Sequence, residues 1–320
     1  MGAYQRGAKG DEVSRIQDRL RALSFYRGPI DGNFGGGTES AVRAFQQARG
    51  LDVDGMVGRE TWRALFDGAA IVAPAIVSES LAYRSLALTG AFETDTGPPD
   101  CFAGLSGDFD QQGLSFGVCQ WNLGQGSLQP LLTAMDRGHA AVVDEVFGPH
   151  AAELRAMLAT SRDEQLAWAR SIQNQRSVVA EPWRGLFKSL GRRPEFQAVE
   201  VDAAGRMYQQ ALAWCRTYGV RSERAVALMF DIRAQNGSIS DTTRAQIERD
   251  FQTIDPADPA AAEVERLRAI ATRRAEAANP TWVADVLVRK LTIANGVGTV
   301  HGAHYDLEAQ YGIGLAPAVS

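Results

Sequence analysis

The stretch DGNFGGGT, residues 31–38, decides the fold of the N-terminal part of the chain, because it returns as DGMVGRET at 54–61. Both copies carry Asp, Gly, Gly and Thr at the same offsets. An amphipathic stretch follows each copy: Val42 and Phe45 lie one helical turn apart in the first, and Trp62 begins the apolar face of the second. The repeat therefore predicts two glycine-rich loops, each leading into a helix.

The residue types in the repeat suit this interpretation. Glycine tolerates the positive φ angles of tight loops, and Thr38 and Thr61 are expected to cap the N-termini of the helices that follow. Ahead of the first loop, residues 11–25 place Val, Ile and Leu side chains on one apolar stripe of a further helix. We therefore predict a compact three-helix unit over residues 1–70.

The motif G-x-x-G-x-x-V-x-x-I-Q-x-x-L begins at Gly7 and precedes the two loop–helix repeats. Together, these features of residues 7–66 resemble the peptidoglycan-binding domain type 1 family. The resemblance implies a non-catalytic module that holds an enzyme on the bacterial cell wall. The module residues that it singles out are Asp31, Gly32, Thr38, Asp54, Gly55 and Thr61. The repeat alone equally fits a module whose only role is to form a stable bundle.

Composition and charge narrow the possible partners. The 320 residues are 45% hydrophobic, with a net charge of −5 and a pI near 5.5. This balance argues against a protein built to coat nucleic acid or anionic lipid, and no stretch approaches the about 20 apolar residues of a membrane span. MGAYQRGAKGDEV has no apolar core of a signal peptide. We expect a monomer without cofactor, made in the cytoplasm and acting on the wall in the periplasm after holin release or injection.

An alanine-rich stretch without a helical stripe, 71–79, is predicted to link this module to a second domain over 80–320. Most of the second domain shows apolar residues at three- and four-residue steps, as amphipathic helices do. The exception is 101–132, which is rich in glycine with short alternating pieces and predicts a small β-sheet or hairpin. The chain is therefore predicted to be mainly α, with a small β-region in the second domain.

The stretch GAFETDTG, residues 90–97, ends a predicted apolar helix on an acid. A charged Glu93 there would meet the negative end of the helix dipole. An apolar wall formed by Phe92 and Phe102 would disfavour the charge further. A position that suits a charged carboxylate poorly suits a proton donor, so Glu93 is the candidate general acid. A surface glutamate in a loop is the alternative.

A helix that ends on an acid, followed by a small β-region and a helical remainder, resembles the lysozyme-like superfamily. GLSFGVCQWN is similar to the G-x-G-L-M-Q stretch of goose-type lysozymes and lytic transglycosylases, with Gly117, Val118 and Gln120 at its matching positions. Thr94 stands where those families have serine, and the spacing from the acid to the glutamine is longer here. The resemblance implies a lysozyme-like α+β domain that cleaves glycans with Glu93 as general acid.

A second carboxylate is expected near the β-region. Asp108 and Asp110 lie in SGDFDQQG, and strand alternation would direct both to one face, away from Phe109. Asp110 is preferred as the partner of the acid, with Asp95 and Asp100 as alternatives. Each of these aspartates could instead form an Asx turn. Without an opposing carboxylate the chain would fit a lytic transglycosylase.

Further polar and aromatic residues suit a sugar's hydroxyls and apolar ring face. The candidates for substrate binding are Gln120, Trp121, Asn122, Gln235, Asn236, Asn295, His301 and Tyr305. Asn236 and Asn295 each precede a glycine and equally fit helix C-caps. Asp231, within an apolar run, is predicted to pair with Arg233 or Arg289. His301 and His304 are too few ligands for a metal site, so no metal is expected.

We predict a modular peptidoglycan-degrading glycoside hydrolase of the muramidase or endolysin type. It would cleave the β-1,4 bond between N-acetylmuramic acid and N-acetylglucosamine, with Glu93 protonating the leaving oxygen and Asp110 or Asp108 stabilising the oxocarbenium-like centre or activating water. Four alternatives stay open: a lytic transglycosylase, a chitosanase-like or chitinase-like hydrolase, a non-catalytic wall-binding structural protein, and a metal-dependent amidase or peptidase.

Overall fold

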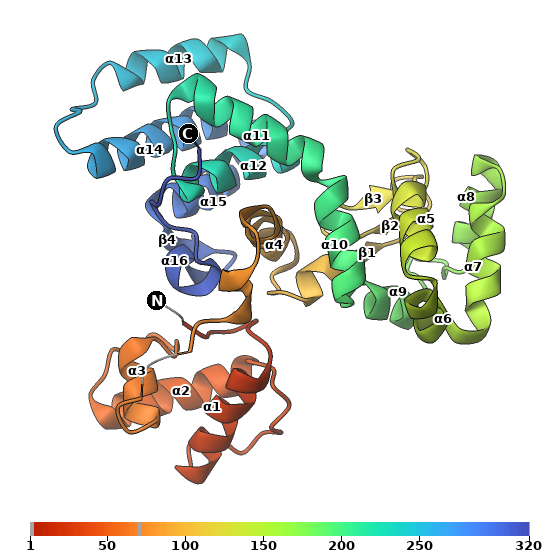
Figure 1. Cartoon of the computed structure of the whole chain (residues 1–320), viewed down its shortest axis with the longest axis horizontal. Coiled ribbons are helices and arrows are strands. Elements are labelled where there is room, and N and C mark those ends of the chain that lie inside the picture. Colours follow the sequence, from red (N-terminus) through yellow and green to blue (C-terminus); the bar gives the residue numbers. More distant parts are fainter. Residues whose placement is uncertain (1–2, 70–71, 320) are drawn as a thin grey trace. The chain divides into compact units, whose positions relative to one another are not determined.

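A computed structural model describes residues 3–69 and 72–319. The chain forms two compact units, which are described separately: Met1–Gly97 together with Arg206–Ser320, and Pro98–Gly205. The predicted mainly α fold with a small β-region is confirmed (Figure 1). Of the predicted linker 71–79, residue 71 lies outside the described residues, while Ala75–Ser78 forms the short 3-10 helix η1.

The N-terminal module contains three helices, α1 (Asp11–Ala22), α2 (Gly36–Arg49) and α3 (Arg59–Leu65). Their apolar faces enclose one core. Ile16 of α1, Phe45 of α2 and Trp62 of α3 are all buried in it. The aromatic ring of Trp62 also stacks on Tyr4, with ring centroids 5.7 Å apart. The three-helix arrangement thus agrees with the periodicity of the sequence.

The two loops of the repeat are each held by a buried glutamine from the preceding helix. Gln17 Nε2 donates to Asp31 Oδ1 at 2.9 Å and to Thr38 Oγ1 at 3.2 Å, and its Oε1 accepts from the Gly32 amide at 3.0 Å. Gln46 repeats this pattern with the second loop, contacting Asp54, Thr61 and Gly55. A polar side chain that satisfies several loop groups at once explains why the repeat residues recur together.

The expected capping role of Thr38 and Thr61 is wrong. The N-caps are Gly35 and Gly58, neither of which makes a side-chain cap. Both threonines instead lie within the first helical turn, where they are buried and hydrogen-bond the two glutamines. A threonine committed to a buried partner is not available as an N-cap acceptor.

The rest of the first unit is a helical domain. Its helix α4 (Leu81–Thr94) begins at Ser80, whose side chain accepts from the Tyr83 amide, and it is buried from Arg84 to Phe92. Helix α12 (Glu223–Asn236) is likewise buried over most of its length and packs against α4 and α15. The remaining elements are α11 (Gly205–Tyr218), α13 (Asp241–Phe251), α14 (Pro259–Glu276), η4 (Pro280–Trp282), α15 (Val283–Asn295), β4 (Val297–Val300), β5 (Ala303–Asp306) and α16 (Leu307–Tyr311).

The second unit contains the predicted small sheet. Strands β1 (Leu105–Ser106), β2 (Ser115–Phe116) and β3 (Trp121–Asn122) pair antiparallel in that order. Phe116 packs into an apolar core formed with the helices, and its ring stacks on Phe196. The helical elements are η2 (Asp100–Ala103), α5 (Leu128–Gly138), α6 (Ala140–Phe147), η3 (Gly148–His150), α7 (Ala151–Leu158), α8 (Arg162–Ser171), α9 (Trp183–Gly191) and α10 (Pro194–Ala203).

Two fold features add to the sequence-based picture. The hairpin of β4 and β5 lies within a segment that the sequence marks only as glycine-rich. It pairs Val297 with Asp306 and Val300 with Ala303.

Among residues 3–69 and 72–319, no helix combines the length and the apolar character needed to cross a membrane.

Candidate active site

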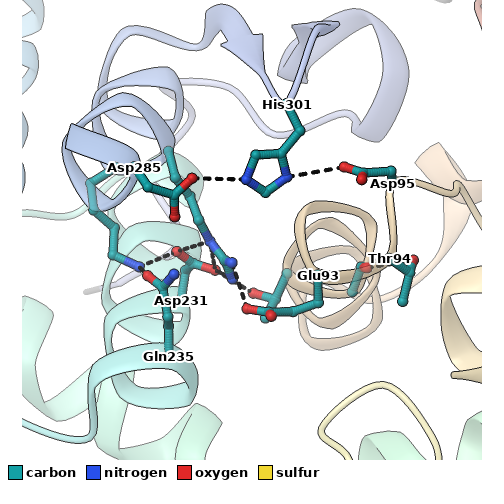
Figure 2. A network of polar contacts seen from close by, with 11 residues as sticks. Glu93, Thr94, Asp95, Asp231, Gln235, Asp285 and His301 are labelled. Atoms are coloured by element: carbon teal, nitrogen blue, oxygen red, sulfur yellow. Dashed lines mark hydrogen bonds and ion pairs between the residues drawn. The ribbon is translucent and has the colours of Figure 1, made fainter. Parts of the chain in front are cut away.

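Glu93 lies in the last turn of α4, where the buried helix emerges at the surface. The helix ends at Thr94, and Asp95 follows in the left-handed conformation with φ of 54°. Thr94 Oγ1 donates back to the Gly90 carbonyl at 2.8 Å. The Glu93 side chain is 46% exposed, so one end of an otherwise buried helix presents a carboxylate to solvent (Figure 2).

A buried arginine holds one oxygen of this carboxylate. Arg289 Nη1 donates to Glu93 Oε1 at 2.5 Å, and the Arg289 side chain is only 2% exposed. The guanidinium also lies over the ring of Phe92, 5.1 Å from its centroid. Glu93 Oε2 makes no hydrogen bond within the described part of the chain. The structure thus fixes one oxygen and leaves the other available.

Asp231 holds the Arg289 side chain in place. Its side chain is 1% exposed and accepts from Arg289 Nη2 at 2.6 Å, from Thr89 Oγ1 at 3.0 Å and from Lys290 Nζ. The predicted pairing of Asp231 with Arg289 is confirmed. The alternative partner, Arg233, donates instead to Gln210 Oε1 at 2.6 Å.

Burial and the neighbouring charges shift the pKa values of Asp231, Arg289 and Lys290. Burial opposes ionisation of Asp231, but the ion pairs with Arg289 and Lys290 outweigh it and hold the pKa of Asp231 well below its usual range. Burial lowers the pKa of Lys290 to about 8, against the opposing attraction of Asp231. Burial also acts against the charge of Arg289, yet Asp231 and Glu93 raise the pKa of Arg289. Asp231 is therefore an ionised carboxylate held between two cations.

The expected apolar wall around Glu93 is wrong in one respect. Phe92 is fully buried and packs edge-on against Tyr305, with centroids 4.8 Å apart, so it belongs to the core beneath the site. The group that faces Glu93 is the guanidinium of Arg289. Phe102 is buried in η2 of the second unit.

His301 joins the loop after α4 to the start of α15. It lies in the β4–β5 turn, where its Nδ1 is 3.0 Å from Asp95 Oδ1 and its Nε2 is 2.8 Å from Asp285 Oδ1. Hydrogen bonding to Asp285, and then to Asp95, outweighs burial and raises the pKa of His301. Figure 2 shows the imidazole between the two carboxylates. Asp95, an alternative second carboxylate, is therefore occupied by the histidine.

The other predicted binding residues of this unit differ in whether they contact the network of Glu93. Gln235 Oε1 accepts from Lys290 Nζ at 2.6 Å, which joins Gln235 to the network of Glu93. Asn236 ends α12, and its side-chain oxygen is buried without a partner. Asn295 Oδ1 accepts from Arg268 Nε at 2.7 Å. Tyr305 is buried against Phe92, so its ring cannot contact a sugar.

The predicted carboxylates of the second unit are held by their own loop. Asp108 Oδ1 accepts from the Gly113 amide at 2.6 Å, and Oδ2 pairs with Arg170 Nε at 2.6 Å. Burial opposes the charge of Asp108, but these partners lower the pKa of Asp108. Asp110 is exposed, and its Oδ1 accepts from the Gln112 amide at 3.1 Å, as in an Asx turn. Asp100 pairs with Arg192 at 2.5 Å.

The expected strand alternation at Asp108 and Asp110 is wrong. Residues 107–113 form the loop between β1 and β2, so the two side chains do not follow a pleat. Phe109, between them, is 75% exposed rather than packed on the opposite face. Glycine and aspartate, which favour turns over strands, explain the difference.

The GVCQW stretch forms a tight turn over a buried acid. Gly117 has φ of 87°, and a Cβ there would lie 2.0 Å from Glu200 Oε1, so no larger residue fits. The same Glu200 oxygen accepts from the Val118 amide at 2.9 Å, and burial raises the pKa of Glu200 well above its usual range. Gln120, with φ of 50°, donates to the Gly117 carbonyl at 2.9 Å.

The remaining predicted residues of this turn are largely structural. Asn122 is buried, and its Oδ1 accepts from the Gln125 amide at 2.7 Å. Trp121 is half-buried against the apolar core of the second unit. Of these residues, Gln120 and Trp121 keep some exposed surface, whereas Asn122 is committed to its own turn.

Sequence reasoning missed the role of Lys290 and of Asp285. The dipeptide RK in an amphipathic helix is typical of a solvated face, yet both of its side chains are buried. The available signal was Asp231 inside an apolar helix, because a buried carboxylate requires cationic partners. Of the two cations that pair with Asp231, the sequence predicts Arg289 and not Lys290.

Comparison with known proteins identifies the N-terminal module. Residues 9–65 match the family described as a putative peptidoglycan binding domain. The predicted resemblance of this module is confirmed. Its repeat residues Gly32 and Gly55 are buried in the loops, and Thr38 and Thr61 are buried in the first turns of α2 and α3, which gives all four a structural role. Their part in wall binding stays a prediction.

The curated relatives match this chain over short stretches. A spore cortex-lytic enzyme of Bacillus cereus is 51% identical over 57 residues, which cover 18% of this chain and 22% of that protein. The N-acetylmuramoyl-L-alanine amidase CwlM of Mycobacterium tuberculosis is 46% identical over 57 residues, covering 18% and 14%. The chain thus matches only 22% and 14% of the length of these two curated relatives.

Comparison with solved structures covers more of the chain. A GH46 chitosanase of Gynuella sunshinyii in complex with chitotetraose has a TM-score of 0.44 at 15% identity, covering 71% of this chain and 97% of that one. A native chitosanase from Bacillus subtilis has a TM-score of 0.42 at 19% identity, covering 68% and 89%. A Burkholderia AP3 phage endolysin has a TM-score of 0.20 at 19% identity, covering 86% and 100%.

Proposed function

We propose that this chain is a glycoside hydrolase that degrades bacterial peptidoglycan, with Glu93 as its general acid. The observation that carries the proposal is the half-exposed Glu93 at the end of a buried helix, with Oε1 fixed by the buried Arg289 and Oε2 available. Glycosidic bond cleavage needs a positioned carboxylic acid that protonates the leaving oxygen. The wall-binding module supplies the substrate class.

The network beneath Glu93 suits this proton transfer. Arg289 holds Oε1, so Oε2 is the oxygen that would carry the proton toward the glycosidic oxygen. As the proton leaves, negative charge develops on the carboxylate, and the guanidinium is already in place to stabilise it. Asp231 and Lys290 keep Arg289 from moving, since both are buried and paired with each other. Preorganised charge of this kind costs no rearrangement during the reaction.

Asp110 is the proposed second carboxylate. Asp108 commits both oxygens to Gly113 and Arg170, whereas Asp110 is exposed and accepts one backbone hydrogen bond. Asp110 therefore retains capacity to activate water or to stabilise the oxocarbenium-like centre. If neither residue contributes, the same general acid would support a lytic transglycosylase, which is distinguished by 1,6-anhydro products.

The module supports peptidoglycan as the polymer. The curated relatives that carry it are named as a cortex-lytic enzyme and an N-acetylmuramoyl-L-alanine amidase. A docking module beside a catalytic unit raises the local concentration of substrate. We propose cleavage of the β-1,4 bond between N-acetylmuramic acid and N-acetylglucosamine, by a monomer acting at the wall.

The test is wild type against Glu93→Gln on purified sacculi, with mass spectrometry of the soluble fragments. Glutamine keeps the shape of the side chain but has no proton to donate, so the rate should fall by roughly a thousandfold. The matched control is Glu248→Gln, which removes an exposed glutamate paired with Arg244 at 2.8 Å and should leave the rate unchanged. Equal lysis by Glu93→Gln and wild type would show that Glu93 is not the acid.

A further inference from the structure

A pocket of about 460 Å³ opens in the first unit between the ends of α12 and α14 and the start of α15. Its polar and aromatic lining consists of Gln235, Asn236, Arg274, Asn279, Trp282 and Asp285. The mechanism proposed for Glu93 uses none of Asn236, Arg274 or Trp282. A concave site with a few convergent polar groups is a candidate ligand site.

Arg274 is the unusual residue of this pocket. Burial lowers the pKa of Arg274, its Nε is buried without a partner, and its side chain forms no ion pair or hydrogen bond with the described residues. The adjacent Arg273 pairs with both Asp250 at 2.7 Å and Glu276 at 2.8 Å. A half-buried guanidinium without a counter-ion is costly, since it loses hydration and gains no partner. An anionic ligand would supply the missing charge.

The other lining groups fit an N-acetylated sugar. Trp282 is 60% exposed and offers an aromatic face for the apolar face of a sugar ring. The side-chain oxygen of Asn236 is buried without a partner and can accept from an acetamide N–H. The Gln235 amide nitrogen has no hydrogen bond among the described residues, because only its oxygen is used, by Lys290.

We propose that this pocket binds an N-acetylated amino sugar that carries a carboxylate, the chemical class of N-acetylmuramic acid. The carboxylate pairs with Arg274, the ring lies on Trp282, and the acetamide meets Asn236. This assignment rests on the proposed function, because it names the part of the glycan that the enzyme holds. It disfavours chitosan, whose ammonium groups would face the unpaired Arg274.

Two of the residues that line the pocket contact residues near Glu93. Gln235 contacts Lys290, and Asp285 contacts His301. Figure 2 shows Gln235 and Asp285 beside the ion pairs that lead to Glu93. A sugar bound here would therefore lie against side chains that contact Lys290 and His301.

The binding experiment uses the full chain in the Glu93→Gln background, so that no substrate is cleaved. The probes are N-acetylmuramic acid and N-acetylglucosamine, titrated by NMR. N-acetylmuramic acid should bind more tightly, and Arg274→Gln should weaken it about tenfold with no effect on N-acetylglucosamine. Arg273→Gln, whose side chain is outside the pocket lining, is the matched control and should change neither affinity. Trp282→Ala, at an exposed site, should weaken both sugars.

The outcomes separate this proposal from the proposed function. Equal binding of the two sugars, or an affinity for N-acetylmuramic acid that is unaffected by Arg274→Gln, would overturn the pocket assignment even if sacculi are cleaved. Binding that depends on Arg274 in a chain whose wild type leaves sacculi intact would support the pocket and refute the hydrolase. Circular dichroism confirms that each variant is folded, and Trp282→Ala provides a second test should Arg274→Gln unfold the chain.

Discussion

The two regions that carry candidate carboxylates are built in opposite ways. Glu93 is positioned by Arg289, which is held among the buried charges of Asp231 and Lys290. Asp108 and Asp110 are positioned by backbone amides of their own loop, with one exposed arginine. The contrast teaches that the first carboxylate depends on long-range tertiary structure, whereas the loop carboxylates depend on local turns.

The largest expected effect is the loss of the buried anion. Asp231→Ala leaves the buried Lys290 without a counter-ion and Arg289 with Glu93 alone, which should lower the free energy of unfolding by about 3–5 kcal/mol. Urea denaturation measures it, and hydrolysis should fall as Arg289 loses its anchor. The loop equivalent, Arg170→Ala, removes an exposed arginine from Asp108, whose other oxygen keeps the Gly113 amide, and should cost about 1 kcal/mol or less. Equal losses of unfolding free energy in Asp231→Ala and Arg170→Ala would contradict the contrast between the buried network and the loop.

The distribution of these contacts explains how much the sequence could predict. The loop–helix repeat and the helix end at Glu93 were predictable, because glycine, proline and turn residues act on neighbours. The pairing of Glu93 with Arg289 joins residues 196 positions apart, and that of Asp231 with Lys290 joins residues 59 apart. The periodicity of a single helix does not predict contacts between residues so far apart in the sequence. The aspartate in an apolar helix indicated that partners exist, without naming Lys290.

The second prediction separates the two loop aspartates. Asp110→Asn should reduce kcat on sacculi roughly a hundredfold, equivalent to about 2.7 kcal/mol of transition-state stabilisation. Its thermal midpoint should stay unchanged, because its Asx hydrogen bond survives in asparagine. Asp108→Asn should show the reverse pattern, a lower midpoint with near-normal kcat, since it weakens the pair with Arg170. A larger loss of kcat in Asp108→Asn would reverse the assignment of the second carboxylate.

The third prediction concerns the buried acid under the GVCQW turn. Because burial raises the pKa of Glu200, the folded chain holds a proton there that the unfolded chain releases above its ordinary pKa. The stability from this group is complete below the unfolded pKa and is lost as pH rises through the folded pKa, by about 1.4 kcal/mol per pH unit in that window. Glu200→Gln keeps an acceptor for the Val118 amide and should remove this slope.

Thermal melts from pH 5 to 9 test the Glu200 prediction. The wild type should lose stability with rising pH relative to Glu200→Gln, and the difference should concentrate in the unit Pro98–Gly205. Parallel pH profiles for the two proteins would mean that Glu200 does not exchange a proton on unfolding.

The smallest expected effect is at His301, which ties the loop after Glu93 to α15 through Asp95 and Asp285. Its pKa is raised in the folded chain, so the stability that it adds is fully present below the unfolded pKa and is lost as pH rises through the folded pKa. Since the imidazole is 38% exposed, solvent screening limits the contribution to less than about 1 kcal/mol.

His301→Gln tests this tie between the Glu93 loop and α15. The wild-type advantage in unfolding free energy over His301→Gln should be present at pH 5 and vanish at pH 9. A constant difference across this range would mean that His301 acts through packing alone. A pH-dependent difference accompanied by a fall in kcat above the folded pKa would show that the Glu93 region needs the protonated histidine as well as the buried arginine.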